Sequence, residues 1–311
     1  MSLQQLRYLL ALDDLRHFSL AAKQCFVAQP TLTTQLKKLE EELGVQLIDR
    51  KASPLRPTPV GEKVIAQARI ILEDVAGLEA LLREETGSLA GTYVLGIIPT
   101  LAPYLLPLFL KSFTSRFPDV HLVIREMQSE EIMEGLKRGK VDLGLLVTPL
   151  EDKQLREIVL FYEPLQVYAA PTEPILTNAR LLPEHINQKE LWVMEEGHCF
   201  RNQVLNICNF QTDGRHLNRA ITFQAGSIET LKNMVRNNLG YTIVPEMSIH
   251  PTLDKGYVKS FADPQPAREV SLVVSKAFSR EQLLVEFRKA VLAVIPDRFR
   301  KNERYVGVAW R

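Results

Sequence analysis

The sequence is poor in cysteine, in net charge and in long apolar runs. Its 311 residues include three cysteines, and the formal net charge is +1. Three cysteines do not make a disulfide framework, and a nearly neutral chain offers no gross electrostatic attraction to nucleic acid or membrane. No apolar run approaches the ~18 residues of a spanning helix. Residues 1–7 lack a basic stretch ahead of an apolar one, so no secretory signal is visible. We therefore expect a cytoplasmic protein of two or three domains, with no membrane partner and with reduced thiols.

The first 44 residues show the pattern of a helix-turn-helix. Leucine spacing predicts a helix over 3–15, Ser19 is expected to cap a short helix at 20–25, and Pro30 is expected to open a third helix that Gly44 ends. One face of the third helix is apolar, and the other carries short polar groups that suit base edges and phosphates in a major groove. Its predicted buried stripe is Leu32, Leu36, Leu39 and Leu43. Its predicted DNA-facing residues are Gln29, Pro30, Thr31, Thr33, Thr34 and Lys37.

A basic, proline-broken stretch follows at residues 50–58. It predicts a wing against the phosphate backbone, with Arg50 and Arg56 as contacts. Residues 1–60 carry 8 Lys/Arg against 6 Asp/Glu, which is a weak electrostatic footprint. The pattern by itself therefore leaves DNA binding open. Cys25, in the short helix, is expected to be a small buried hydrophobe.

A long helix is predicted from Pro59 to about Glu85, capped by Thr58. Its apolar positions recur every 3.5 residues, which is typical of a helix that pairs with another helix. At ~1.5 Å per residue the helix spans roughly 40 Å. A second copy of the chain is the simplest partner, and packing against the chain's own regulatory part is the alternative. The stripe consists of Val60, Val64, Ile71, Val75, Leu78 and Leu82.

From Thr92 onward, apolar runs alternate with helical segments. This alternation predicts a parallel α/β sheet in two lobes, with a cleft at the carboxyl ends of the strands. Thr100 and Ser129 follow the first two strands and can place hydroxyls in that cleft, or can instead cap the next helices. The basic tail 298–311 lacks periodicity and is expected to be disordered or loosely packed. Strands are predicted at 93–98, 120–124, 141–147, 165–170, 190–194, 220–223, 240–245 and 269–274, and helices at 103–117, 129–138, 227–238 and 279–295.

Two cysteines, Cys199 and Cys208, lie nine positions apart in a stretch with no Gly or Pro between them. If that stretch is helical, the side chains are separated by ~13 Å of rise and lie on opposite faces. A disulfide needs Cα atoms within ~7 Å. The bond can therefore form only if the segment refolds, which would turn a sulfur reaction into a conformational switch.

The neighbours of the two cysteines differ. His198 and Arg201 can favour a thiolate at Cys199, whereas Glu195 and Glu196 would oppose it and are expected to point away. Cys208 has no cation beside it and suits the role of the second thiol, which condenses with a sulfenic acid at Cys199. Two ordinary buried cysteines remain the alternative. Metal-ligand pairs at the usual spacing are missing, so no metal and no cofactor is expected.

The N-terminal part, residues 6–61, resembles the winged helix-turn-helix of LysR-type transcriptional regulators. The resemblance rests on the runs at 6–8, 18–22, 29–35, 39–44 and 58–61. It implies promoter DNA as partner, and a regulatory part of two lobes like those of periplasmic solute-binding proteins, with chain crossings near 162–166 and 265–269. The expected fold is α/β with an all-α N-terminal part. The expected divisions are a DNA-binding domain at 1–58, a dimerisation helix at 59–87, lobe I at 92–164 and 268–297, lobe II at 165–267, and the tail at 298–311.

The regulatory half also resembles the peroxide-sensing members of that family. The residues that carry this likeness are 196–199 with 201, 203 and 208, then 98–100 with 103–107, and 227–235. The resemblance implies that Cys199 reacts with peroxide and pairs with Cys208, that Thr100 and Ser129 help to hold peroxide, and that Arg268 assists. Ser129 stands where a threonine is expected and Asn202 where an aspartate is expected. The segment 209–219 is a few residues longer than the pattern.

Three functional hypotheses follow. The first is a redox-switched activator that senses hydrogen peroxide and is reset by a thiol–disulfide reductant. The second keeps the DNA-binding half but has the cleft bind a small metabolite, with structural cysteines. The third, a thiol peroxidase, is disfavoured by the helix-turn-helix, so we expect no enzyme. Partners on the first hypothesis are promoter DNA, a second copy in a dimer and then a tetramer, and RNA polymerase.

Overall fold

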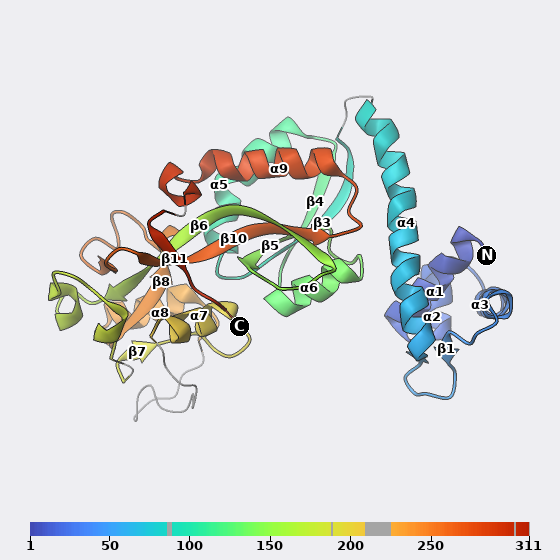
Figure 1. Ribbon diagram of the computed structural model, residues 1–311, viewed down its shortest axis with the longest axis horizontal. Coiled ribbons are helices and arrows are strands. Elements are labelled where there is room, and N and C mark those ends of the chain that lie inside the picture. Colours follow the sequence, from blue (N-terminus) through green and yellow to red (C-terminus); the bar gives the residue numbers. More distant parts are fainter. Residues whose placement is uncertain (86–88, 188, 209–224, 302, 311) are drawn as a thin grey trace. The chain divides into compact units, whose positions relative to one another are not determined.

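The computed structural model describes residues 1–85, 89–187, 189–208, 225–301 and 303–310 (Figure 1). The chain divides into two compact units. The first comprises Met1–Ser88 with Ala277–Glu281, and the second comprises Leu89–Lys276 with Gln282–Arg311. A search of the described helices finds none with the length and apolar character needed to cross a membrane. The strand predicted at 220–223 and the long segment 209–219 lie outside the described residues.

The first unit is built on three helices, as predicted. These are α1 (Leu3–Leu15), α2 (Phe18–Gln24) and α3 (Gln29–Leu43). Gly44 ends α3 in a left-handed conformation, with φ +70°. Leu32, Leu36 and Leu39 are fully buried, but Leu43 is 38% exposed, so the predicted stripe was one residue too long. The prediction that Ser19 caps α2 was wrong, because His17 occupies the cap position and the Ser19 hydroxyl donates to Gln29 at 2.7 Å.

The wing is a short antiparallel pair, β1 (Ile48–Asp49) with β2 (Arg56–Pro57). It is followed by α4 (Pro59–Glu85), whose first turn is capped by the Thr58 hydroxyl, which accepts from the Gly61 amide at 3.0 Å. Ile65 and Ala68 of α4 are buried in the core of the first unit. Along the predicted stripe, Val60 and Leu78 are 41% and 62% exposed, so apolar side chains remain uncovered on this helix within the first unit.

The second unit contains a mixed sheet with the order β4-β3-β5-β10-β6-β8-β7 (Figure 1). β3, β4 and β5 run parallel, as predicted. β10 is antiparallel to both β5 and β6, and β6 is antiparallel to β8, so the prediction of a parallel sheet was wrong at its centre. The bounds are β3 (Gly91–Ile97), β4 (Val120–Glu126), β5 (Leu143–Thr148), β6 (Leu155–Ala169), β7 (Leu191–Trp192), β8 (Tyr241–Pro245), β9 (Val258–Ser260) and β10 (Gln265–Ser275).

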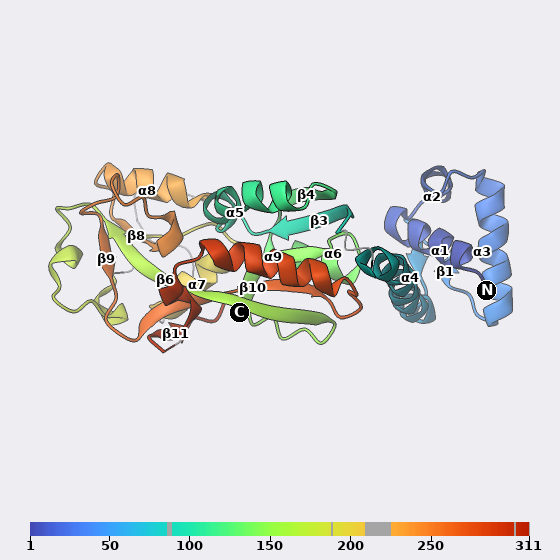
Figure 2. The same cartoon turned by 90° about the horizontal axis from the view of Figure 1, so that it is seen from above.

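The two long strands β6 and β10 pass from one half of the sheet to the other. We call the half with β3, β4 and β5 the first lobe and the half with β7, β8 and β9 the second lobe. In the first lobe, α5 and α9 lie on one side of the sheet and α6 on the other, while α7 and α8 belong to the second lobe (Figures 1 and 2). The remaining bounds are α5 (Ala102–Arg116), α6 (Ser129–Lys137), α7 (Cys199–Ile207), α8 (Ile228–Arg236), α9 (Glu281–Val294), η1 (Pro174–Thr177), η2 (Pro183–His185), η3 (Glu246–Ser248) and η4 (Asp297–Arg300).

The C-terminal tail is ordered, so the prediction of a disordered or loosely packed segment was wrong. β11 (Tyr305–Gly307) pairs in parallel with the first residues of β10, and the Val308 amide continues the pairing to the Ala267 carbonyl at 2.9 Å. Trp310 is only 3% exposed. Beside its basic residues the tail contains Tyr305, Val306 and Val308, which are the aromatic and β-branched types that suit an added strand.

Candidate redox site

The site is centred on α7, which begins at Cys199 and ends at Ile207, as the helical hypothesis required. The apolar side chains of Phe200, Val204 and Ile207, at positions i, i+4 and i+7, are buried in the core of the second lobe. Before the helix, Gly197 adopts φ +95°, and a Cβ there would lie 2.8 Å from the Gln128 side chain. Glycine is therefore needed for the chain to enter α7 against the start of α6.

Cys199 lies in the interior, between the first turn of α7 and the start of α6. Its side chain is 6% exposed. Burial raises the pKa of its thiol, whereas the Ser129 hydroxyl and the Arg268 guanidinium lower it. Burial is the larger effect, so the thiol is more protonated at neutral pH than an exposed cysteine. Ser129 and Arg268 are thus the groups positioned to stabilise negative charge on this sulfur.

Arg268 is held rigidly by a fully buried ion pair. It lies on β10 opposite Glu163 on β6, and its Nε donates to Glu163 Oε2 at 2.8 Å. Glu163 Oε1 also accepts from the Met247 amide at 2.8 Å. On its other side the guanidinium donates to both the hydroxyl and the carbonyl of Thr100, at 2.9 and 3.0 Å. Both charges are 0% exposed, so each depends on the other.

The two hydroxyls singled out in the sequence, Thr100 and Ser129, are both 2% exposed. Neither caps a helix, because the cap residues of α5 and α6 are Leu101 and Gln128. Thr100 accepts from Arg268, which leaves its own O–H free to donate. Ser129 Oγ makes no well-formed hydrogen bond among the described residues, and the Cys199 thiol is the group on which it acts. A buried hydroxyl with unused hydrogen-bonding capacity is uncommon, and a small polar molecule or a water is the kind of group that would satisfy it.

The charged neighbours of Cys199 differ from those expected. Arg201 donates to the Met194 carbonyl at 3.4 Å, and Arg268 takes the place of the cation that acts on the thiol. His198 is 9% exposed and occupies the cap position of α7, with its Nε2 3.7 Å from Glu195. A carboxylate that raises the thiol pKa is Glu130, on α6. The sequence did not indicate that Glu130 lies near Cys199, because the two residues are 69 positions apart in the chain.

Sequence reasoning also missed Glu163. An acidic residue within an apolar run, opposite an arginine within another apolar run, was the available signal. This signal can be recognised only when β6 is known to pair with β10. The first ten residues of β6 were not predicted as strand.

Cys208 follows the last residue of α7. It packs against the apolar core of the second lobe, and burial raises the pKa of its thiol to about 12. Both cysteines are free thiols. Nine residues of helix separate them by ~13 Å of rise, whereas a disulfide needs Cα atoms within ~7 Å. In this conformation the two thiols cannot bond.

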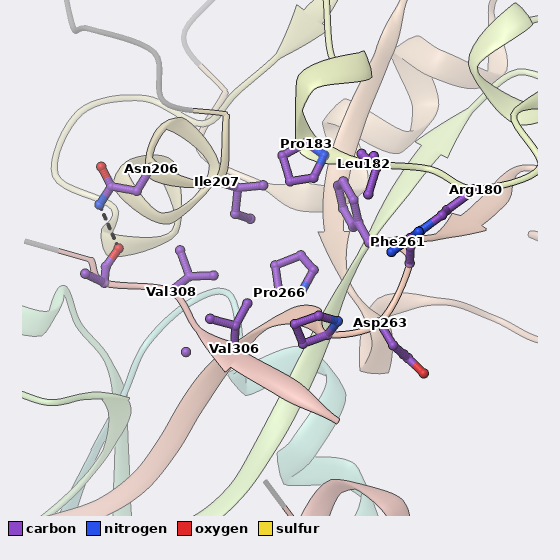
Figure 3. Close-up of a pocket in the computed structure, with 14 residues that line it drawn as sticks. Arg180, Leu182, Pro183, Asn206, Ile207, Phe261, Asp263, Pro266, Val306 and Val308 are labelled. Carbon is purple, nitrogen blue, oxygen red and sulfur yellow. Dashed lines mark hydrogen bonds between the residues drawn. The ribbon is translucent and has the colours of Figure 1, made fainter. Parts of the chain in front are cut away.

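A pocket of about 420 Å³ lies elsewhere in the second unit, against the C-terminal end of α7 (Figure 3). Its walls are mostly apolar, with Pro183, Phe261 and Val306 among them, and Arg180 lies on its border. Thr100, Ser129 and Cys199 do not line it. In the part of the chain that the structure describes, no group of three or more His, Cys, Asp or Glu could hold a metal ion.

The predicted DNA-facing residues lie on α3 and the wing. Gln29, Pro30, Thr31, Thr34 and Lys37 are exposed, and Thr33 is half-buried with its hydroxyl on the Gln29 carbonyl. Arg56 is exposed on the wing.

The guanidinium of Arg50 is engaged within the first unit. It donates to Glu40 Oε2 at 2.6 Å, and the other oxygen of Glu40 accepts from the Leu47 and Ile48 amides. Arg50 therefore ties the wing to α3.

Comparison with known proteins decides the family. Residues 3–62 match the bacterial regulatory helix-turn-helix model of the lysR family, and residues 86–295 match the LysR substrate binding domain. The chain belongs to the LysR family. This LysR-family chain is 34% identical over 276 residues to a hydrogen peroxide-inducible genes activator of Haemophilus influenzae, covering 88% of this chain and 90% of that protein.

Two further relatives bear on function. The transcriptional regulator EstR of Acinetobacter baylyi is also 34% identical, over 301 residues, with 94% of this chain and 98% of that protein covered. A full-length OxyR from Pseudomonas aeruginosa, solved as a cysteine-to-aspartate variant, superposes with a TM-score of 0.76 at 31% identity, covering 95% of this chain and 99% of that one. The peroxide-inducible activator and EstR are equally similar to this chain, so the comparison does not identify the signal to which the chain responds. That signal has to be argued from the site.

Proposed function

We propose that this LysR-family regulator senses hydrogen peroxide through Cys199 and Cys208. The observation that carries the proposal is the arrangement around Cys199: a buried Ser129 hydroxyl and a guanidinium fixed on Thr100, both of which lower the pKa of the buried thiol. Hydrogen peroxide is small, neutral and rich in hydrogen-bonding capacity, so it fits a buried polar site better than a charged metabolite does.

The chemistry then runs in two steps. The Cys199 thiolate attacks one peroxide oxygen, the O–O bond breaks, and hydroxide leaves as water after taking up the thiol proton, which gives a sulfenic acid. The Cys208 thiolate next attacks the oxidised sulfur, the S–O bond breaks, and a second water leaves. Two thiols and one peroxide thus become one disulfide and two waters. Thr100 and Ser129 can orient the peroxide, and Arg268 can stabilise the departing negative charge.

The second step requires α7 to unwind, because its two ends hold the cysteines apart. Unwinding withdraws Phe200, Val204 and Ile207 from the core of the second lobe. We propose that this change reaches promoter DNA through the LysR-type helix-turn-helix, in copies paired along exposed apolar positions of α4, such as Val60 and Leu78. A cytoplasmic location, beside the promoter and a thiol–disulfide reductant, accords with this role.

The test compares reduced and peroxide-treated protein. About one equivalent of peroxide should remove two thiols and create an intramolecular Cys199–Cys208 bond in peptide maps, with a changed DNA footprint. The Cys199→Ser chain should retain the reduced footprint. Links between chains alone, or a footprint in Cys199→Ser that still responds, would reject the proposal.

A second candidate function is a metabolite-responsive regulator. The similarity to EstR and the apolar pocket in Figure 3, which neither Cys199 nor Cys208 lines, favour it. In that case the Cys199→Ser chain would keep its full response to the inducer, and peroxide would have no effect on the wild-type footprint.

A further inference from the structure

The outer face of α7 is bound by the C-terminal tail. Three amide side chains donate to three consecutive backbone carbonyls: Asn202 to Trp310 at 3.0 Å, Gln203 to Val308 at 3.0 Å, and Asn206 to Ala309 at 2.8 Å. Figure 3 shows the last of these as a dashed line at the edge of the pocket. We call this set of contacts, between α7 and residues 308–310, the C-terminal clasp.

The tail side of the clasp is anchored at two further points. The Val308 amide donates to the Ala267 carbonyl, immediately before Arg268 on β10. The Trp310 indole donates to the Pro149 carbonyl at 2.9 Å, just after β5 of the first lobe. The tail therefore connects α7 of the second lobe to a strand beside Arg268 and to the first lobe.

The clasp matters because α7 is short. A nine-residue helix is marginal by itself in water, since isolated helices need about 12–15 residues. Its stability must come from the core contacts on its inner face and the clasp on its outer face. Gln203 is 0% exposed, which shows that the clasp also excludes water on its inner side. A broken clasp would leave buried polar groups without partners.

Asn202 supplies one of the three donors of the clasp. An aspartate, which the family resemblance leads one to expect at this position, has no N–H and could not donate to the Trp310 carbonyl. Asparagine supplies that donor, and Asn206 supplies the next one a turn later on the same face. The two residues add contacts to α7 without touching Cys199.

We infer that the C-terminal clasp positions α7 in its helical form and thereby sets how readily the Cys199–Cys208 disulfide forms. This inference rests on the proposed redox function. When α7 unwinds, its amides lose their spacing against the extended tail, so the disulfide form loses the clasp. The clasp stabilises the dithiol form, and weakening it favours the disulfide.

The test uses the full-length chain with Asn202→Asp and Asn206→Asp combined. Asparagine and aspartate have similar helix propensities, so the helix itself changes little. One new charge lies near each end of α7, and their interactions with the helix dipole have opposite signs. Asn237→Asp is the matched control, because it removes the same kind of amide-to-carbonyl bond, to Asn233 at 2.8 Å, on the neighbouring helix α8.

Two hydrogen bonds of ordinary net strength together correspond to about a tenfold change in equilibrium. In a glutathione buffer the double variant should favour the disulfide about tenfold over wild type, a reduction potential ~30 mV more negative. In the reduced protein, the backbone amides of α7 should exchange hydrogen about tenfold faster. Asn237→Asp should match wild type in both measurements.

If the double variant and wild type show the same hydrogen exchange in α7 and the same reduction potential, the inference about the C-terminal clasp is wrong. A wild-type chain that forms no Cys199–Cys208 bond would overturn the proposed function instead, and the exchange measurement on reduced protein would still decide whether the clasp holds α7.

Discussion

The two ends of α7 carry the same side chain in different surroundings. At the first end, the Ser129 hydroxyl and the charge of Arg268 lower the pKa of the Cys199 thiol, in opposition to burial. At the other end, Cys208 packs against apolar side chains, and burial alone raises its pKa to about 12. The comparison shows that the two thiols differ because other helices and strands place different side chains around each sulfur. On the proposed function, Cys199 is therefore the thiol that reacts first with peroxide, and Cys208 is the thiol that reacts once α7 has moved.

The largest expected effects are those of replacing each of the two cysteines, and the two replacements should give different products. Cys199→Ser should abolish the loss of thiols on treatment with one equivalent of peroxide. Cys208→Ser should instead stop the reaction at a sulfenic acid on Cys199, because the second nucleophile is missing. Dimedone labelling followed by mass spectrometry distinguishes these outcomes. Sulfenic acid on Cys208 in the Cys199→Ser chain would reverse the assignment.

Removing the cation at the first end should be nearly as severe. Arg268→Gln leaves Glu163 charged and buried without its partner, so we expect the free energy of unfolding to fall by about 3–5 kcal/mol. Denaturant titration measures this change. The double variant Arg268→Met/Glu163→Gln should recover most of the loss, because no lone charge remains. A loss below about 1 kcal/mol in Arg268→Gln would show that the pair is solvated.

The pH dependence tests the protonation of the first thiol. Because burial raises the pKa of Cys199 above that of an ordinary thiol, the thiolate fraction should rise about tenfold per pH unit across the neutral and mildly alkaline range. The rate constant for oxidation should therefore grow roughly hundredfold between about pH 7 and 9. Stopped-flow peroxide consumption follows it, with Cys199→Ser as the blank. A plateau below about pH 8 would mean that Ser129 and Arg268 outweigh burial.

Ser129 should matter for the reaction and not for stability. Its hydroxyl makes no well-formed hydrogen bond among the described residues, so Ser129→Ala should change the free energy of unfolding by less than about 0.5 kcal/mol. The oxidation rate should fall about threefold, which is the effect of one hydrogen bond of ordinary net strength to peroxide. Ser129→Thr, which keeps the hydroxyl, should retain most of the rate. An unchanged rate in Ser129→Ala would remove this residue from the site.

The third cysteine should show the smallest effect. Cys25 lies at the end of α2, partly buried against the core of the first unit, and burial raises its pKa. Among the residues that the structure describes, no cation lowers the pKa of this thiol. Cys25→Ser should leave the peroxide response of the DNA footprint unchanged. A lost response would mean that the first unit contains a second sensor.

Local pattern was enough for the helices. The leucine stripe of α3, the Thr58–Pro59 start of α4 and the stretch between the two cysteines each carry their own spacing and end signals. The conflict between helix and disulfide could be predicted for the same reason, since it depends only on nine residues of known geometry.

Long-range pairing was beyond local pattern. Arg268 reaches Cys199 only because β10 pairs with β6, which also places Glu163 behind it. The nearby Arg201 was the more visible cation in sequence, yet its guanidinium donates to the Met194 carbonyl. The order of the C-terminal tail could not be predicted for the same reason. The tail pairs with β10 and bonds to amide side chains of α7, and both are far from it in the chain.

The most direct test of the switch is hydrogen exchange along α7 before and after one equivalent of peroxide, with α8 as internal reference. The account predicts that amides of residues 200–207 lose protection when the Cys199–Cys208 bond forms, while those of 228–236 keep theirs. A Cys199–Cys208 disulfide in a chain whose α7 amides remain protected would contradict it.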